Sequence, residues 1–507
     1  MPSERDVFSA SRQRVARRRW FRPTAVLLSL SPLVVIEALC VCFGWGRPAR
    51  HDDPFVGFRS VRPLFVLNED RTRYEVPAAR QMYFRPESFP AKKANNEFRV
   101  FCLGGSSVQG RPFAIETSFT TWLEISLQAA DSRRRWEVVN CGGISYATYR
   151  LVPILRELLG HEPDLIILYT GHNEFLEDRS FEHVRARGEF VNRLIATAGR
   201  LRTFTLMREG YLHLRGDSVT DTADDRPQLP TEVESLLDYR GGLEAYHRDD
   251  RWRRNVIAQF RHNVRHMVEM TREAGVDLIL VNPVSNLSDS PPFKSEPRAD
   301  LGTAERRAWV SLRRAAREHL RQGDIGAREA VPLLEQACEI DPLHAATWYM
   351  LAECTLKIGK IEPAREAYLR AKELDVCPLR ILEPMNEAVL EIAHQTGTPL
   401  VDVQALFARR SPNGLVGGDW LLDHVHPGIP GHRLIADALA DKLVTLGVVR
   451  PEPGWRDRKE QAFQAHLASL DDLYFAKGSQ RLEVVRRWTQ GRAELARPAT
   501  TSAPVPR

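Results

Sequence analysis

The stretch FRVFCLGGSSVQG, residues 98–110, decides the fold. Apart from one arginine, its first six residues are β-branched, aromatic or apolar, which is typical of a buried strand. Two glycines and two serines come next, where a chain can turn sharply into a helix. Four later runs have the same strand-like character, and they are Trp136 to Val139, Asp164 to Tyr169, Val276 to Val281 and Leu400 to Val403.

Helical patterns lie between these runs, for example at Tyr149–Leu159 and Arg254–Ala274. Continuous apolar strands separated by helices indicate a parallel sheet that is covered on both faces. The expected fold class is therefore α/β, with a flavodoxin-like three-layer sandwich. In such sheets the binding site lies outside the carboxyl ends of the strands, so the residues directly after each strand are the candidates for chemistry.

Polar motifs follow four of the five predicted strands. Ser106 begins a predicted helix, where the macrodipole favours a developing negative charge. Asp423 and His426 are three residues apart, so one local turn can present both and the carboxylate can orient the imidazole. The four motifs are Gly104-Gly105-Ser106-Ser107, Asn140-Cys141-Gly142-Gly143-Ile144-Ser145, Gly171-His172-Asn173 and Asp423-His424-Val425-His426.

Together these motifs resemble those of the SGNH (GDSL-type) hydrolases, over residues 98–175, 276–283 and 398–447. The resemblance implies that Ser106 is the nucleophile, although a glycine replaces the aspartate of the Gly-Asp-Ser-Leu motif. It also implies that His426 is the base and that Asp423 orients it.

The same resemblance implies an oxyanion hole built from three donors. These are the backbone N–H groups of Ser106 and Ser145 and the side-chain amide of Asn173. The family's second motif usually supplies a glycine where this chain has Ser145, so Gly143 is the alternative donor.

Neighbouring residues offer alternatives for these roles. Ser107 would be the nucleophile if the turn were shifted by one residue, while His424 is expected to be a neighbour of the base rather than the base itself. Cys102 and Cys141 are expected to be buried packing residues. The chain has no Cys-x-x-Cys or His-Glu-x-x-His spacing, so neither a metal nor a cofactor is expected.

A polar, proline-rich loop, residues 282–297, follows the fourth predicted strand and would border the site. Asn286, Lys294 and Ser295 are therefore candidate substrate contacts. The alternative is that this loop only connects the sheet to the helices that follow it.

Residues 311–378 look helical and repeat with a period of 34 residues, so that Ala330, Leu334 and Ala337 recur as Ala364, Tyr368 and Ala371. This pattern resembles the tetratricopeptide repeat, a helical unit that commonly binds peptides. Only two units are visible, so we expect the segment to pack on the α/β domain and to be a possible site for a protein partner. A plain helical hairpin is the alternative.

An apolar stretch of 23 residues, Thr24 to Gly46, is interrupted by Pro32 and Glu37. It is long enough to span a hydrocarbon core of about 30 Å. The positive-inside bias predicts a single-pass anchor with a cytoplasmic N-terminus and an extracytoplasmic or periplasmic catalytic domain, because the stretch follows Arg12, Arg14, Arg17, Arg18, Arg19 and Arg22. A cleaved signal peptide is the alternative, although no small-x-small site follows the stretch.

The formal net charge of +5 is small for 507 residues, so a nucleic-acid partner is not expected. The expected organisation is a basic cytoplasmic segment (1–23), the anchor (24–46), a connecting segment (47–95), a first part of the hydrolase domain (96–300), a helical insertion (301–380), a second part of the hydrolase domain (381–450), and a helical, partly disordered tail (451–507) whose last residues, 497–507, are expected to be disordered.

The resemblance implies a membrane-tethered serine esterase that acts on an acyl ester. An O-acyltransferase that modifies an envelope polysaccharide would use the same triad and stays open. A non-catalytic scaffold is the alternative from a different class, and the intact set of Ser106, Asn173, Asp423 and His426 argues against it.

Overall fold

The computed structural model describes residues 63–176, 246–321 and 324–490, together with residue 243 and short pieces within 32–45 and 201–207. Contacts divide the chain into two units. One consists of Met1–Arg59 and Ala186–Gln228, and the other of Ser60–Arg185 and Leu229–Arg507. The second unit contains the sheet, the helical insertion and every candidate site residue.

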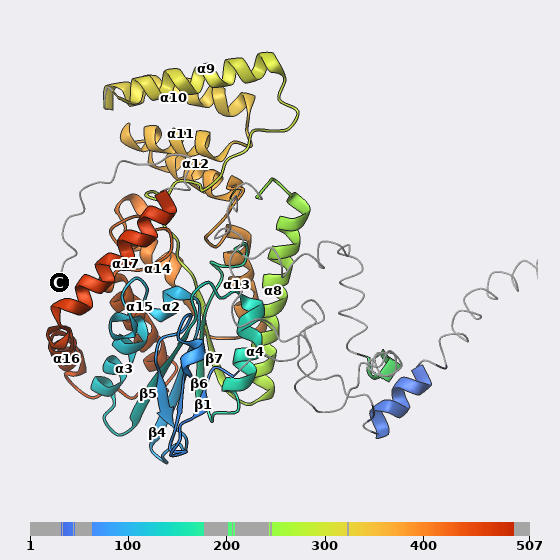
Figure 1. Cartoon of the computed structure of the whole chain (residues 1–507), viewed down its shortest axis with the longest axis vertical. Coiled ribbons are helices and arrows are strands. Elements are labelled where there is room, and N and C mark those ends of the chain that lie inside the picture. Colours follow the sequence, from blue (N-terminus) through green and yellow to red (C-terminus); the bar gives the residue numbers. More distant parts are fainter. Residues whose placement is uncertain are drawn as a thin grey trace, which may run out of the picture. The chain divides into compact units, whose positions relative to one another are not determined.

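The second unit is built on a five-stranded parallel sheet in the order β5-β4-β6-β7-β8 (Figure 1). Taken along the chain, this is the order 2-1-3-4-5 of a flavodoxin-like doubly wound sheet. The five predicted strands and the parallel α/β fold are confirmed. The strand bounds are β4 (Glu97–Gly104), β5 (Arg135–Gly142), β6 (Leu165–Tyr169), β7 (Asp277–Asn282) and β8 (Leu400–Asp402).

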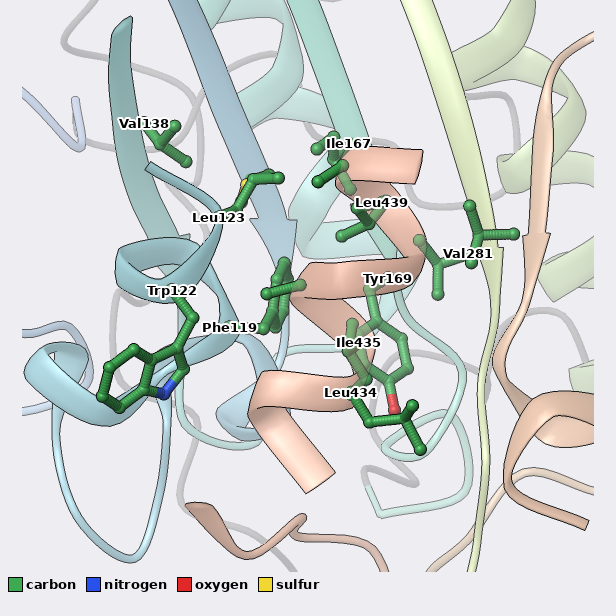
Figure 2. Close-up of a cluster of buried hydrophobic side chains, with 14 of the residues drawn as sticks. Phe119, Trp122, Leu123, Val138, Ile167, Tyr169, Val281, Leu434, Ile435 and Leu439 are labelled. Carbon is green, nitrogen blue, oxygen red and sulfur yellow. The ribbon is translucent and has the colours of Figure 1, made fainter. Parts of the chain in front are cut away.

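Helices cover both faces of this sheet. One face carries α3 (Phe119–Ala130) and α15 (Ile429–Thr445), and the other carries α4 (Thr148–Leu158), α8 (Asp250–Glu273) and α13 (Glu383–Thr396). Figure 2 shows the first of these cores, in which Ile167 and Tyr169 of β6 lie beside side chains from α3 and α15. Successive strand residues face opposite sides, so the intervening residues of β6 are buried under the second layer.

The helical insertion consists of two antiparallel hairpins stacked on each other (Figure 1). Alanines at the crossings, such as Ala330, Ala352 and Ala371, are fully buried and let the helices approach closely. The first helix begins earlier than the predicted residue 311, because the Glu305 carboxylate accepts the Gly302 N–H at 3.0 Å and caps it there. The helices are α9 (Thr303–Leu320), α10 (Asp324–Ile340), α11 (Ala345–Lys357) and α12 (Ile361–Leu374).

The remaining elements surround the sheet. A short antiparallel sheet lies within the connecting segment, whose sequence has no clear periodicity but is compatible with a short hairpin. Its strands are β1 (Val66–Leu67), β2 (Arg73–Glu75) and β3 (Ser88–Pro90). The tail forms α16 (Trp455–Ser469) and α17 (Asp472–Gln490), and the predicted disorder at 497–507 lies outside the described residues.

The predicted anchor is described only in part. Residues 34–43 are helical, and most of the rest of 24–46 lies outside the described residues. The Glu37 carboxylate accepts the backbone N–H groups of Arg202 and Thr203 at 2.8 and 2.9 Å and the Thr203 hydroxyl at 2.6 Å. Within the part of the chain that the structure describes, we find no helix with the length and apolar character needed to cross a membrane.

Candidate active site

Ser106 stands at the topological switch point of the sheet. It begins the short helix α2 (Ser106–Gln109) directly after β4. Both glycines before it are needed for close packing, since a Cβ on Gly104 would lie 2.0 Å from the Tyr169 carbonyl oxygen and one on Gly105 would lie 2.8 Å from Nδ2 of Asn173. The turn therefore places Ser106 beside the carboxyl end of β6, where open α/β sheets bind ligands.

Ser106, His426 and Asp423 form a continuous hydrogen-bonded relay. The Ser106 Oγ lies 2.7 Å from Nε2 of His426, and Nδ1 of His426 lies 2.6 Å from Oδ2 of Asp423. The other carboxylate oxygen accepts the backbone N–H groups of Val425 and His426, each at 2.9 Å. A carboxylate at Nδ1 places the proton there, so Nε2 is free to accept the serine proton.

Electrostatics keep the acid of this relay ionised. Burial alone would raise the pKa of Asp423, but the neighbouring His426 and His424 and the hydrogen bonds to the carboxylate hold that pKa below its ordinary value. Burial lowers the pKa of His424 to about 4, so this ring is neutral at pH 7. The Ser106 hydroxyl contacts His426, while Nδ1 of His424 lies 3.6 Å from Asp423.

The candidate oxyanion donors come from the loops that pack around Gly105, the residue before Ser106. The Asn173 amide follows β6 and donates to the Tyr146 carbonyl at 3.1 Å, next to the Gly105 turn. The Gly143 N–H donates to the Gly104 carbonyl at 3.0 Å and is therefore engaged. In contrast, Ser145 has a positive φ of 60°, and its N–H meets no acceptor among the described residues. The geometry favours Ser145 over Gly143 as the backbone donor from this loop.

The loop after β7 contacts the protein through all three of its candidate substrate residues. Asn286 donates from Nδ2 to the Asp423 carbonyl at 3.1 Å and from its backbone to the His424 carbonyl at 2.9 Å. Lys294 donates to the carbonyls of two residues, Leu243 and Tyr246, and the Ser295 Oγ accepts the N–H of Ala346 in α11 at 2.8 Å. Lys294 and Ser295 therefore fit the alternative, in which the loop connects the sheet to the inserted helices. Asn286 instead supports Asp423 of the relay.

Two buried charged residues, Arg380 and Asp375, each fasten this loop to the insertion. Arg380 donates to the carbonyls of Asn286 and Ser290 at 2.5 and 2.9 Å, and Asp375 accepts the N–H groups of Phe293 and Lys294 at 2.8 and 3.0 Å. Burial raises the pKa of Asp375 to about 7, and the positive charge of Arg380 opposes that rise. Sequence reasoning missed both residues, because nothing in their spacing marks them as partners of a loop that lies 80 to 95 residues earlier.

The two cysteine thiols near the ends of β4 and β5 are unreactive. Burial raises the pKa of the Cys102 and Cys141 thiols, so neither is an available nucleophile at neutral pH. Within the described ranges, no three His, Cys, Asp or Glu side chains come together in a way that could hold a metal ion.

A comparison with known protein families supports the interpretation of the insertion as a tetratricopeptide repeat. Residues 320–376 match the tetratricopeptide repeat family, which confirms the predicted repeat. No match was found among curated proteins.

Solved structures provide further similarities, all at low identity. The chain is similar to a lipolytic protein of the G-D-S-L family from Desulfitobacterium hafniense DCB-2, with 11% identity, 68% of this chain and 99% of that chain covered, and a TM-score of 0.29. It is similar to an acetylxylan esterase from Geobacillus stearothermophilus, with 13% identity, coverage of 68% and 94%, and a TM-score of 0.30. It is also similar to an α/β hydrolase from the metagenome of Lake Arreo, Spain, with 12% identity, coverage of 70% and 98%, and a TM-score of 0.29.

Proposed function

We propose that the chain is an SGNH-type serine hydrolase that cleaves ester bonds at Ser106. The observation that carries the proposal is the relay in which Ser106 Oγ, the His426 ring and the Asp423 carboxylate are joined at 2.7 and 2.6 Å. All three residues are at least nine-tenths buried, so water does not compete for these contacts. A buried serine joined to a base and an acid in this way is an activated nucleophile.

The chemistry follows from these positions. His426 takes the hydroxyl proton through Nε2 as Ser106 attacks the carbonyl carbon, and Asp423 stabilises the imidazolium that forms. The tetrahedral oxyanion is held by the Asn173 amide and by the N–H groups of Ser145 and Ser106. His426 then returns the proton to the leaving alcohol, and water repeats the sequence to release the acid.

We also propose that the N-terminal stretch 24–46 tethers the chain to a membrane with the hydrolase on the extracytoplasmic side. The basic residues ahead of the stretch support this orientation. The hydrogen bonds that Glu37 accepts from Arg202 and Thr203 would offset part of the cost of burying its carboxylate. A periplasmic reporter fused after residue 507 should be active, and a reporter that works only in the cytoplasm would contradict the orientation.

The enzymatic proposal is tested by hydrolysis of p-nitrophenyl esters of increasing chain length. We expect turnover in the wild type and its loss in Ser106→Ala. Ser107→Ala is the matched control, because the Ser107 hydroxyl donates to the Val425 carbonyl at 3.2 Å and does not contact His426. Equal turnover in wild type and Ser106→Ala would refute the proposal, and turnover that requires a polysaccharide acceptor would reassign the chain as an acyltransferase.

A further inference from the structure

Three arginines gather at residues 111–113, the segment that follows the Ser106 turn. Arg85 and Arg481 both donate to the carbonyl of Phe113, at 3.4 and 2.9 Å. Arg111 lies two residues before Phe113, directly after α2, and its backbone N–H donates to the Ser106 carbonyl at 3.2 Å. Arg481 comes from α17, so the C-terminal helix completes the group. We call these three residues the arginine cluster.

The arginine cluster has no paired acid. None of its guanidinium groups forms a salt bridge with any residue that the structure describes, and the Arg85 Nε is buried without a hydrogen-bond partner there. Burial lowers the pKa of both Arg85 and Arg111, and the charge of Arg481 lowers each further. Three partly buried cations that repel one another cost stability unless an anion joins them.

One member of the arginine cluster, Arg111, lies within electrostatic reach of Asp423 in the proposed relay. The charge of Asp423 raises the pKa of Arg111, against the larger effect of burial. Asp423 is already engaged by His426, so it is not free to pair with Arg111. Through its backbone contact with Ser106 and the charge of Asp423, Arg111 is linked to two members of the proposed relay.

An open cavity of about 480 Å³ gives a ligand access to two of the three arginines, Arg85 and Arg481. Arg85 and Arg481 line it together with Lys477, and Glu87, Glu116 and Asp471 are its acids. Glu87 accepts the N–H groups of Ser88 and Asn140, and burial raises its pKa to about 7, so its negative charge is reduced. Asp471 accepts the Tyr474 N–H at 2.7 Å. Glu116 remains as an exposed acid near Arg85.

Helix α17 is held firmly in the position that delivers Arg481. Gly478 packs against the Phe113 ring so closely that a Cβ there would lie 2.0 Å from it. Further along the helix, Arg486 donates to the Leu422 carbonyl at 3.2 Å, next to the Asp423 loop. Arg481 is thus preorganised, which lowers the entropic cost of binding a ligand.

We propose that Arg85, Arg111 and Arg481 form an anion-binding subsite next to Ser106, and that the ester substrate carries a carboxylate, phosphate or sulfate group. Guanidinium groups match the geometry of these oxyanions with paired hydrogen bonds. This inference rests on the proposed hydrolase function, because it specifies the substrate of the same site.

The test compares a neutral and an anionic ester of the same leaving group, p-nitrophenyl butyrate and mono-p-nitrophenyl succinate. We expect the full-length wild type to prefer the anionic ester at least tenfold in kcat/KM, and Arg111→Gln and Arg481→Gln to lose most of that ratio. Arg314→Gln, an exposed arginine on α9, is the control that keeps the ratio. A wild type without preference, or variants whose ratio stays within twofold of wild type, would overturn the subsite.

A binding measurement separates this inference from the hydrolase proposal. In Ser106→Ala, which cannot turn over, succinate, inorganic phosphate and sulfate are compared by their effect on Tm. We expect at least one of them to raise Tm at millimolar concentration, less so when Arg111→Gln is added, and the ranking identifies the group that is bound. If wild type hydrolyses no ester but the Tm shift depends on Arg111, only the hydrolase proposal fails. If no anion shifts Tm, the subsite fails even where neutral esters are hydrolysed.

Discussion

The carboxylate of Asp423 holds His426 at two points, with Oδ2 at 2.6 Å from the ring Nδ1 and Oδ1 at 2.9 Å from the backbone nitrogen. The backbone contact fixes the acid even when the ring moves, so the acid can set both the tautomer and the orientation of the base. This double contact makes the Asp423 carboxylate the part of the relay whose substitution is easiest to interpret.

Asp423→Asn is expected to lower kcat for ester hydrolysis by about 10⁴-fold with little change in KM. The amide keeps the shape of the side chain but can stabilise the wrong histidine tautomer and cannot stabilise the imidazolium. Steady-state kinetics with a p-nitrophenyl ester measure the loss. A variant that keeps more than a tenth of wild-type kcat would mean that Asp423 does not orient and stabilise the catalytic histidine.

Asn173→Ala is expected to reduce kcat by about 10²–10³-fold, because one oxyanion donor is removed. The Asn173 amide donates to the Tyr146 carbonyl at 3.1 Å, so some loss of local order accompanies the change. Thermal unfolding of the same sample separates the two effects. A fall in kcat that is matched by a large fall in Tm would count against a direct role in the transition state.

Arg380→Met is expected to lower the free energy of unfolding by about 1–3 kcal/mol for each hydrogen bond lost, because the carbonyls of Asn286 and Ser290 would be left without this donor. The loss at the Asn286 carbonyl, a hydrogen bond of 2.5 Å, also loosens the support of Asp423. Chemical denaturation measures the loss, and kcat should fall with it. Arg380 lowers the pKa of Asp375 through its charge, so adding Asp375→Asn should not give a purely additive loss. A purely additive double variant would argue against this electrostatic coupling.

His432→Asn should flatten the pH dependence of stability between pH 6.5 and 4. Burial lowers the pKa of His432 to about 3, so over this window the unfolded chain binds a proton that the folded chain does not. Stability therefore falls as the pH falls, by up to about 1.4 kcal/mol per pH unit for this group. The Asn side chain can still accept the Phe119 N–H that His432 accepts at 3.2 Å.

Denaturant titrations at several pH values give the free energy of unfolding of wild type and of His432→Asn. The slopes of these two free energies against pH are then compared. The comparison between variants matters because burial raises the pKa of Glu87, Glu174 and Asp375 to about 7. Those acids stabilise the fold below pH 4.5 and lose that contribution as the pH rises through 7, opposite in sign to the histidine. Identical slopes in wild type and variant would refute the assignment of His432 as a neutral buried ring.

The strands and the order of the motifs were predictable because both depend on local sequence. Runs such as FRVFCL, which are apolar on both faces apart from Arg99, are typical of a covered parallel strand. The meeting of Ser106 with His426, 320 residues apart, follows once both are placed at the same edge of the sheet. The tetratricopeptide repeat was predictable from its period, although its first helix begins at Thr303 rather than near 311.

Other features depend on contacts that no local pattern encodes. The choice between Ser145 and Gly143 rests on a single backbone hydrogen bond from Gly143 to Gly104. Asn286 and Lys294 were expected to contact substrate, whereas in the structure they contact other parts of the protein. The reason is that the loop that holds them is fastened to the insertion by Asp375 and Arg380. The arginine cluster likewise forms only when α17 packs against Phe113, so its members look like ordinary surface arginines in the sequence.

The most direct test of the account is to react the full-length chain with a fluorophosphonate and to map the modified residue by tandem mass spectrometry. We expect one phosphonylated residue, Ser106, with labelling lost in Ser106→Ala, slowed strongly in His426→Gln and retained in Ser107→Ala. Labelling of Ser107 or another residue, or labelling that persists in Ser106→Ala, would contradict the proposed nucleophile and the mechanism built on it.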